Sequence, residues 1–445
     1  LNALPASGHM RRTPKYRTTA RLFASSAYSF MSLTDHQQEA YDVVYERLAS
    51  GERFTGLRGY AGTGKTFLVT QLVDQLTSEG CTVTVCAPTH KAVQVLRDQL
   101  NGGDVETQTL HSYLGLRLQP DVDGQYVLVP EGMEEERPAS VVVCDEASMV
   151  GRDEWEYIQA SQRNLQWLFV GDPAQLPPVN EEPSPALEVE GPMLEEVHRQ
   201  STDNPILDLA TKVRQGTAHR FQSRFKDGIG VAITHKRDAF LDTVLRTFNS
   251  DAFADDATHA RLLAYRNRTV RQYNREIRTA RYGDDAPRFE EGEWLVARET
   301  WFHDAAPVVK NSEELRVTRT SITTFEADDL SEWKVWKLKV RSPYAAFTRS
   351  ILVLHEDEHD RYENDMERLR LRAKEDGSNW GAFYELRERF AAVDYAYATT
   401  VHKAQGSTFD TVFVDHRDLQ ACRGPEKAAL LYVAVTRPAR RLALL

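Results

Sequence analysis

Short apolar runs alternate with amphipathic segments along the first third of the chain. Runs of apolar and β-branched residues predict strands at 54–57, 82–87, 141–144 and 166–170. Between the first two strands, apolar residues recur at the spacing of one helix face, at Leu68, Val69, Leu72, Val73 and Leu76. Strands that alternate with helices are typical of a parallel sheet covered on both faces. The pattern predicts an α/β lobe over residues 31–184, with a helix beginning at Thr66.

A second α/β lobe is predicted further along the chain. Pro183 and Pro185, in the stretch EEPSP, interrupt the first pattern and predict a linker. The second lobe is expected to consist of two segments, 185–286 and 391–445. Its strand-like runs lie at 261–265, 395–400 and 412–414.

The residues between these two segments follow a different pattern. Short alternating runs at 333–340 and 348–354 predict antiparallel strands, and the highly charged stretch 356–376 predicts a helix. We therefore expect a small β-barrel with a helical arm, inserted over residues 287–390. In the first lobe, turn residues at 121–124 precede a β-like run and predict a short hairpin within 117–138.

Composition narrows the class of protein. A chain of 445 residues with 41% hydrophobic and 27% charged residues should form several domains. No apolar run approaches the roughly 20 residues of a membrane span, and the four cysteines lack metal-type spacing. We therefore expect no membrane partner and a reducing cytoplasm, of a bacterium or of a phage-infected host. The first ten residues, LNALPASGHM, read as a tag remnant, and the basic segment 11–30 is expected to be disordered.

The net charge of −11 gives the chain no overall attraction to nucleic acid. Affinity for phosphates depends on Lys and Arg placed locally, so any such partner has to be inferred from motifs.

The strongest chemical signal is the stretch GYAGTGKT at 59–66, which follows a predicted strand and opens a predicted helix. Glycines let backbone N–H groups close around phosphates, and a helix N-terminus favours anions. We expect ATP to bind here with Mg²⁺. Lys65 would reach the β and γ phosphates and Thr66 would bind the metal. The nucleotide-binding residues are then Gly59, Ala61, Gly62, Thr63, Gly64, Lys65 and Thr66. A glycine turn before an ordinary helix is the alternative, which the complete motif disfavours.

Two carboxylates follow the apolar run 141–144. Ligands of open α/β sheets bind at the carboxyl ends of the strands, so Asp145 is expected to hold Mg²⁺ and Glu146 to polarise the attacking water. The next strand ends in GDPAQLPPV, where Gln175 is the candidate that senses the γ-phosphate. As isolated features, both stretches would pass for ordinary strand ends and turns.

An arginine from a second domain can stabilise the charge on a transferred phosphoryl group. Arg437, in YVAVTR near the C-terminus, is our first candidate for that role, and Arg199, in LEEVHR, is our second. A solvated surface charge is the alternative for any single arginine.

The ordered set of motifs resembles the superfamily-one helicases, and among them the Dda-like helicases of the 5′-to-3′ branch. The matching stretches are LTDHQ at 33–37, GYAGTGKT, APTHKA at 87–92, TLHS at 109–112, CDEAS at 144–148, GDPAQLPPV, LEEVHR, TTVHKAQG at 399–406 and YVAVTR. The order of the motifs is far more specific than any one of them, and it runs from about Leu33 to the end. It covers the hairpin and the inserted barrel only weakly.

The resemblance implies two RecA-like P-loop lobes with ATP and Mg²⁺ between them and single-stranded DNA across both. It also implies an inserted SH3-like barrel and a hairpin that acts as a strand-separating pin. Gln37 would then recognise adenine, although Thr34 and Gln37 equally fit a helix capping box. Gly406 would join the nucleotide site, and Tyr126 would be the residue of the pin that stacks on a base, or else an ordinary packing residue of the hairpin.

The resemblance also implies a set of DNA contacts. Hydroxyls and backbone amides suit phosphate contacts that carry no sequence information. The matching positions are Pro88, Thr89, Lys91, Thr109, His111, Thr399, Thr400 and His402. The two histidines in this set could equally be packed polar residues.

The function expected from the resemblance is an ATP-dependent DNA helicase that moves 5′-to-3′ on single-stranded DNA and opens forked duplexes. It is expected to act as a monomer, with proteins of replication or recombination as partners. Two alternatives remain open: a translocase that displaces proteins or remodels recombination intermediates with little unwinding, and a DNA-binding scaffold without catalysis. The direction of movement rests on the resemblance alone, and RNA is not excluded as the substrate.

Overall fold

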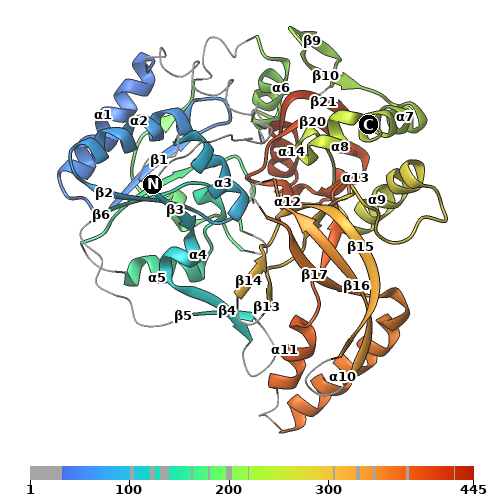
Figure 1. Ribbon diagram of the computed structural model, residues 1–445. Coiled ribbons are helices and arrows are strands. Elements are labelled where there is room, and N and C mark those ends of the chain that lie inside the picture. The colour runs from blue at the N-terminus through green and yellow to red at the C-terminus, as the bar shows by residue number, and fades with distance from the viewer. Residues whose placement is uncertain are drawn as a thin grey trace, which may run out of the picture.

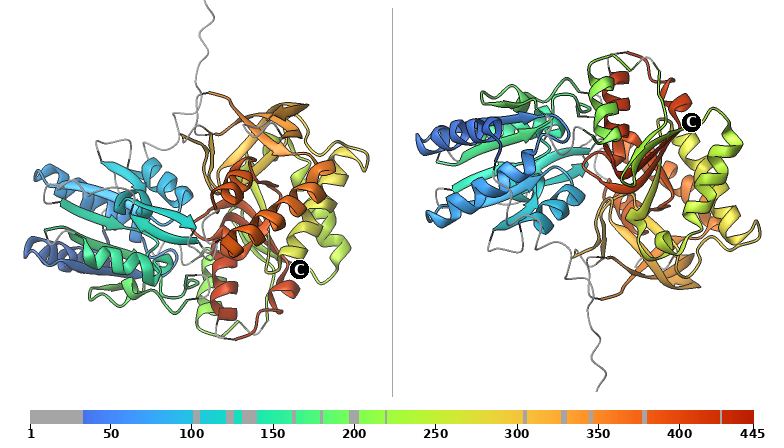
Figure 2. Two further views of the ribbon diagram at one scale, coloured as in Figure 1. Left: turned by 90° about the horizontal axis from the view of Figure 1, so that it is seen from below. Right: turned by 90° about the horizontal axis from the view of Figure 1, so that it is seen from above.

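The protein is described here from a computed structural model. The description covers residues 33–100, 105–120, 126–130, 140–161, 164–178, 181–196, 203–218, 220–303, 306–326, 331–343, 347–376, 380–424 and 426–445. Two α/β lobes lie side by side, and an antiparallel sheet with two helices adjoins the second lobe (Figure 1, Figure 2).

The first lobe is built on a six-stranded sheet in the order β3-β2-β6-β7-β1-β8, in which all neighbours are parallel. Helices α1 to α3 pack on one face, and α4 and α5 pack on the other. The strands are β1 (Phe54–Gly59), β2 (Thr82–Ala87), β3 (Glu106–Thr109), β6 (Ser140–Cys144), β7 (Gln166–Gly171) and β8 (Met193–Leu194). The helices are α1 (Asp35–Ala49), α2 (Lys65–Ser78), α3 (His90–Gln99), α4 (Leu110–Leu114) and α5 (Arg152–Ala160), with short turns η1 (Ala147–Met149) and η2 (Pro185–Leu187).

The second lobe has a six-stranded sheet in the order β19-β11-β20-β21-β10-β9. Its strands are parallel except for β9, which pairs antiparallel with β10 at the edge. The strands are β9 (Arg224–Lys226), β10 (Ile229–Ile233), β11 (Ala260–Ala264), β19 (Ala398–Thr400), β20 (Phe409–Val414) and β21 (Pro438–Leu444). The core on one face includes α6 (Pro205–Arg214), α12 (Val401–Ala404), α13 (His416–Leu419) and α14 (Glu426–Thr436). The core on the other includes α7 (Arg237–Phe248), α8 (Asp251–Asp255) and α9 (Asn267–Tyr282), with η4 (Ala257–His259).

The insertion forms a five-stranded antiparallel sheet in the order β17-β16-β15-β12-β18. Two helices pack against its outer end, next to Trp333. The strands are β12 (Trp294–Ala297), β15 (Glu314–Glu326), β16 (Glu332–Arg341), β17 (Arg349–Leu354) and β18 (Val393–Tyr395). The helices are α10 (His359–Asp376) and α11 (Trp380–Glu388), preceded by η5 (Glu356–Glu358). A separate small ribbon joins β13 (Trp301–His303) to β14 (Ala306–Val309).

The predicted hairpin of the first lobe is present as β4 (Leu116–Pro120) paired antiparallel with β5 (Tyr126–Pro130). It lies beside the insertion, because the guanidinium carbon of Arg117 stands 5.3 Å from the centroid of the Phe302 ring on β13. The side chain of Tyr126 and residues 121–125 lie outside the described part of the chain. Within the described residues, no helix is long and apolar enough to span a membrane.

Three expected boundaries need correction. The stretch at Pro185 is not a linker between lobes, because it forms η2 and the chain then returns as β8 to pair with β1. The first sheet therefore extends beyond residue 184, to Leu194. The run 395–400 is not one strand: Tyr395 ends β18 of the insertion and Ala398 begins β19 of the second lobe. The antiparallel sheet accordingly extends past residue 390.

Candidate nucleotide and nucleic-acid sites

The phosphate-binding loop joins the end of β1 to the start of α2. Gly62 and Gly64 have φ angles of +81° and +85°, in the left-handed region that glycine adopts without strain. A Cβ on Gly64 would collide with the Gln37 side chain, and one on Gly62 would lie 2.8 Å from Cδ1 of Leu207 on α6. The ammonium group of Lys65 donates to the carbonyl oxygens of Gly59 at 2.7 Å and Tyr60 at 3.1 Å. The loop thus has the shape of a phosphate cradle, with its lysine folded onto its own backbone.

Gln37 anchors this loop to the first helix. Its Oε1 accepts from the backbone N–H of Thr34 at 3.1 Å, and the Thr34 hydroxyl accepts from the Gln37 N–H, which completes the capping box. Its Nε2 donates to the carbonyl oxygen of Thr63 at 2.9 Å. The capping interpretation is therefore confirmed, and recognition of adenine by this buried amide stays a prediction.

Asp145 and Glu146 lie at the carboxyl end of β6, as predicted. Asp145 Oδ1 accepts from the Glu146 N–H at 2.8 Å, and Glu146 has a φ of +53°. Burial, and then the neighbouring charge of Glu146, raise the pKa of Asp145 to about 7. A positive φ is costly for a residue with a Cβ, and such strain is concentrated at functional sites.

Tyr432 of α14, in the second lobe, connects two parts of the first-lobe site. Its hydroxyl accepts from the backbone N–H of Ala61 in the phosphate loop at 2.8 Å and donates to Asp172 Oδ2 at 2.8 Å. Asp172 is fully buried and also accepts from the N–H of Ala174 at 2.9 Å. Burial, and then the charge of Asp172, raise the pKa of Tyr432, so its hydroxyl stays protonated and can donate.

Gln175 and Gln405 meet across the same boundary between lobes. Gln405 Nε2 donates to Gln175 Oε1 at 3.3 Å and to the carbonyl oxygen of Leu176 at 3.2 Å. Gly406, with a φ of +69°, brings the second-lobe backbone close to the first lobe, because a Cβ there would lie 3.5 Å from the Thr89 hydroxyl and 3.9 Å from Glu146 Oε1.

Arg437 is buried at the end of α14. Its guanidinium donates to the backbone oxygens of Ser407 at 3.1 Å and Val433 at 3.2 Å. Burial lowers its pKa, while the nearby charges of Glu146 and Asp172 oppose that effect. Arg437 is therefore within the electrostatic reach of the site, and its contact with a γ-phosphate stays a prediction. Arg199 lies outside the described residues.

Tyr432→Phe is expected to lower the free energy of unfolding by about 1.5–3 kcal/mol, because it leaves a buried carboxylate without one of its donors. The change is measured from urea denaturation in the absence of nucleotide. Tyr45→Phe is the matched control, since the Tyr45 hydroxyl donates to Glu79 at the surface and should contribute little. Equal effects of the two substitutions would contradict the proposed inter-lobe link.

Three of the predicted DNA-contact threonines are helix N-caps at the carboxyl ends of strands. Thr89 follows β2, Thr109 ends β3 and Thr400 ends β19, and each hydroxyl accepts from a backbone N–H one turn later. Thr399 precedes the last of these caps, and Pro88 precedes the first. The sheets thus bring these positions to corresponding edges of the two lobes, while their contacts with DNA stay predictions.

The predicted histidines differ in their surroundings. His111 Nε2 lies 2.9 Å from Glu154 Oε1, so it already has a carboxylate partner. His402 is half-buried, burial lowers its pKa, and its ring lies 6.1 Å from that of Tyr265. Both histidines thus have contacts within the protein, as the alternative of packed polar residues would predict, and their contacts with DNA stay predictions.

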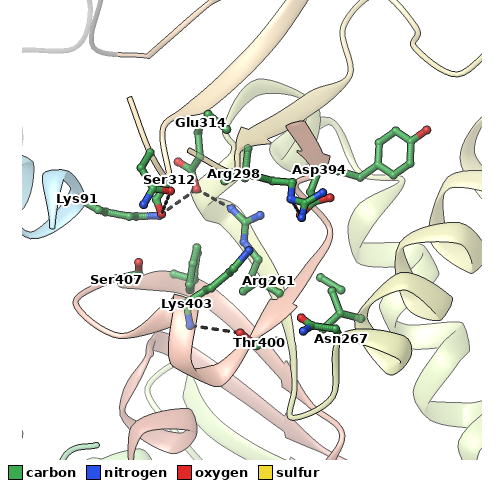
Figure 3. Close-up of a pocket in the computed structure, with 18 residues that line it drawn as sticks. Lys91, Arg261, Asn267, Arg298, Ser312, Glu314, Asp394, Thr400, Lys403 and Ser407 are labelled. Atoms are coloured by element: carbon green, nitrogen blue, oxygen red, sulfur yellow. Dashed lines mark hydrogen bonds and ion pairs between the residues drawn. The ribbon is translucent and has the colours of Figure 1, made fainter. Parts of the chain in front are cut away.

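The predicted DNA contact of Lys91 would require its ammonium group to be free at the surface, but that group already has partners. Its ammonium group pairs with Glu314 Oε1 at 2.9 Å and stands 4.5 Å from the Phe409 ring centroid. Glu314, which is 3% exposed, also pairs with the buried Arg261. Figure 3 shows these side chains arriving from the first lobe, the insertion and the second lobe. In this conformation Lys91 holds three parts of the molecule together.

Comparisons with known proteins match both lobes in the expected order. The family model described as an AAA domain matches residues 32–232, and the one described as a UvrD-like helicase C-terminal domain matches 395–445. The ATP-dependent DNA helicase dda of Enterobacteria phage T4 is 28% identical, over 92% of this chain and 98% of the relative. The chain is a Dda-like superfamily-one helicase.

A second curated relative and one solved structure show different extents of similarity to this chain. The ATP-dependent RecD2 DNA helicase of Deinococcus radiodurans is 32% identical over 39% of this chain and 23% of its own length. The crystal structure of the Pif1 helicase from Bacteroides in complex with ADP-AlF3 and ssDNA gives a TM-score of 0.47 at 16% identity, and it covers 93% of this chain and 92% of that one.

The end of β6 in this helicase has the chemistry that Mg²⁺ requires. Asp145, with its raised pKa, is a buried carboxyl whose charged form a divalent cation would favour. Thr66, at the second residue of α2, is the other candidate ligand. No group of three or more His, Cys, Asp or Glu suited to a metal occurs among the described residues. The pair Asp145 and Thr66 fits Mg²⁺, which takes one or two protein ligands together with phosphates and water.

Four polar residues at the lobe boundary of the helicase have contacts there that no motif predicted. Tyr432, Gln405 and Asp172 lie inside recognised motifs, and a tyrosine within the apolar run LLYVAV of α14 was the available signal. Arg214 was not signalled by any motif, and its guanidinium carbon lies 3.4 Å from the centroid of the Tyr60 ring in the phosphate loop.

Proposed function

We propose that this chain is an ATP-dependent DNA helicase that moves 5′-to-3′ along single-stranded DNA and separates the strands of a forked duplex. The observation that carries the proposal is the bridge made by Tyr432 between the phosphate loop and Asp172. Through it, the second lobe directly contacts the backbone that would hold the phosphates. A change in the bound nucleotide can therefore change how the two lobes meet.

The proposed cycle assigns a role to each residue of the site. ATP binding would draw Lys65 away from the carbonyl oxygens of its own loop and onto the β and γ phosphates. Mg²⁺, held by Thr66 and Asp145, would neutralise phosphate charge when bound. Glu146 would orient the attacking water, and Arg437, together with Arg199, would stabilise the charge on the transferred group.

Translocation would follow from alternating grip by the two lobes. The N-cap threonines at Thr89, Thr109 and Thr400 would contact the strand without reading its sequence. Gln175 and Gln405 would report loss of the γ-phosphate across the lobe boundary. One molecule would be sufficient for this cycle, since both lobes belong to one chain.

We also propose roles for the hairpin and the insertion. The hairpin β4–β5 would part the duplex, with Tyr126 at its tip, and the insertion would adopt an SH3-like barrel that braces it. The contact between Arg117 and Phe302 supports this arrangement, because it joins the two elements directly. A braced hairpin can resist the force with which paired strands oppose separation.

Strand separation on tailed duplexes tests the proposal. Duplexes with a single-stranded tail on one side only, 5′ or 3′, are mixed with the protein, ATP and Mg²⁺, and DNA-stimulated ATP hydrolysis is measured in parallel. Unwinding from the 5′ tail alone is expected. Stimulated hydrolysis without unwinding would instead indicate a translocase, and no hydrolysis would indicate a scaffold.

A further inference from the structure

Helix α9 carries a row of arginines at helical spacing. Arg268, Arg271, Arg275 and Arg278 follow one another at intervals of three or four residues, which places them along one side of the helix. The first three are exposed. Within the described part of the chain, Arg271 and Arg275 make neither an ion pair nor a side-chain hydrogen bond. These two arginines therefore carry uncompensated positive charge in a chain whose net charge is −11.

These two arginines line a cavity of about 460 Å³ between α9 and the antiparallel sheet. The cavity has two more arginines in its wall, and both are already engaged. Arg278 pairs with the buried Glu293 at 3.0 Å, and Arg288 donates to the carbonyl oxygen of Leu354 at 2.9 Å. The engaged pair therefore shapes the wall, while Arg271 and Arg275 are available to a ligand.

The acidic side chains around this cavity do not cancel its charge. Asp394 lines it but lies 3.7 Å from Arg298, which provides its counter-charge. Asp284 also lines the cavity, is exposed, and pairs with no arginine within the described residues. An anion that approaches α9 would therefore meet more positive than negative charge.

A smaller cavity of about 70 Å³ lies next to the second-lobe motif. Asp394 and Tyr395 line both cavities, so β18 forms the wall that they share. At its other end the small cavity is lined by Thr399, Thr400 and Lys403. Figure 3 shows Arg298, Asp394, Asn267 and Lys403 around this passage. The cavity of the unpaired arginines and the cavity of the predicted DNA contacts thus lie next to each other, with β18 as their common wall.

We propose that the arginine face of α9 extends the nucleic-acid track, and that Arg271 and Arg275 bind phosphates of the DNA strand beyond Thr399 and Thr400. This inference rests on the proposed function. The guanidinium fork matches phosphate oxygens in a bidentate way. The shared wall between the cavity of the two arginines and that of Thr399 favours a strand that already lies on the second lobe over a separate acidic peptide. These two arginines would hold the DNA strand at a place that is separate from the nucleotide site.

Binding of oligothymidines of increasing length, followed by fluorescence anisotropy, tests this site. The double variant Arg271→Gln, Arg275→Gln is compared with the wild type at several salt concentrations. For long oligonucleotides the affinity is expected to fall about 10- to 100-fold. The slope of log K against log salt is expected to drop by about 1.4, since each phosphate of a single strand contributes roughly 0.7. The shortest oligonucleotides that bind the wild type should bind the variant equally well.

The matched control is the double variant Lys236→Gln, Arg246→Gln, at the N-cap and near the end of α7. It also removes two positive charges, from exposed positions that line neither cavity. Wild-type affinity and slope for long oligonucleotides in the arginine variant would overturn the inference, as would an equal loss for short and long ones. Loss of binding to an oligoglutamate probe alone would identify a protein-binding surface instead. Failure of the wild type to bind any oligonucleotide would contradict the proposed function rather than this site.

Discussion

Glu146→Gln is expected to slow DNA-stimulated ATP hydrolysis by about 10²- to 10⁴-fold, the range that a positioned general base contributes. Glutamine has almost the same shape but cannot take a proton from water. The substitution also removes the negative charge of Glu146, which is the second cause, next to burial, of the raised pKa of Asp145. Binding of ATP should therefore survive, because the phosphate loop is unchanged. The rate is measured as phosphate release at saturating DNA and ATP.

Two comparisons make that result specific. Glu156→Gln alters an exposed glutamate of α5 in the same lobe and should leave the rate unchanged. Lys65→Ala should abolish nucleotide binding as well as turnover, because the ammonium group is lost from the loop. Turnover at the wild-type rate in Glu146→Gln would remove this residue from the mechanism.

Glu314→Ala should lower the free energy of unfolding by about 3–5 kcal/mol, the range measured when one partner of a buried ion pair is removed. Glu314 is 3% exposed and pairs with both Lys91 and Arg261. Burial alone would raise the pKa of Glu314, but these two cations outweigh it and hold the pKa below its usual value. Without the carboxylate, the buried Arg261 and the largely covered Lys91 both lose their ion-pair partner. The change is measured as the shift of the denaturant midpoint.

The cause of that loss can be isolated with two further proteins. Glu332→Ala removes an exposed glutamate from β16 of the same sheet and should change the midpoint little. Lys91→Met in the Glu314→Ala background should recover part of the loss, because it removes one of the stranded charges. No recovery would mean that packing, rather than charge, accounts for the effect of Glu314.

Four strands of the first lobe, β1, β2, β6 and β7, were predictable because they are largely apolar runs next to a motif. The polar strand β3 (ETQT) and the two-residue strand β8 were not predicted. The strands of the second lobe were harder to predict. Its strands β10 and β21 were missed, and β21 contains Arg440 and Arg441, which break the apolar pattern. The run 395–400 reads as one strand, although its two ends pair with different sheets. A sequence pattern shows that a segment is extended but not where its hydrogen bonds go.

The candidate site shows the same limit at the level of side chains. The phosphate loop and the Asp145–Glu146 pair were predicted because local sequence encodes them. The engagement of Lys91 was not, because its partner Glu314 lies 223 positions away along the chain. Gln37 illustrates a third case, in which one residue satisfies a local rule and a tertiary contact at once.

The short passage from β18 to β19 determines how the insertion can move. Only Ala396 and Tyr397 separate the two strands, and both are buried. Their backbones are tied to opposite sides: the N–H of Ala396 donates to Trp294 of the inserted sheet, and the carbonyl of Tyr397 accepts from Leu262 of the second lobe. A two-residue connection that is buried and hydrogen-bonded on both sides has little freedom to act as a hinge. We therefore expect the insertion to move together with the second lobe. A displacement of the insertion would therefore be transmitted through β19 to Thr400.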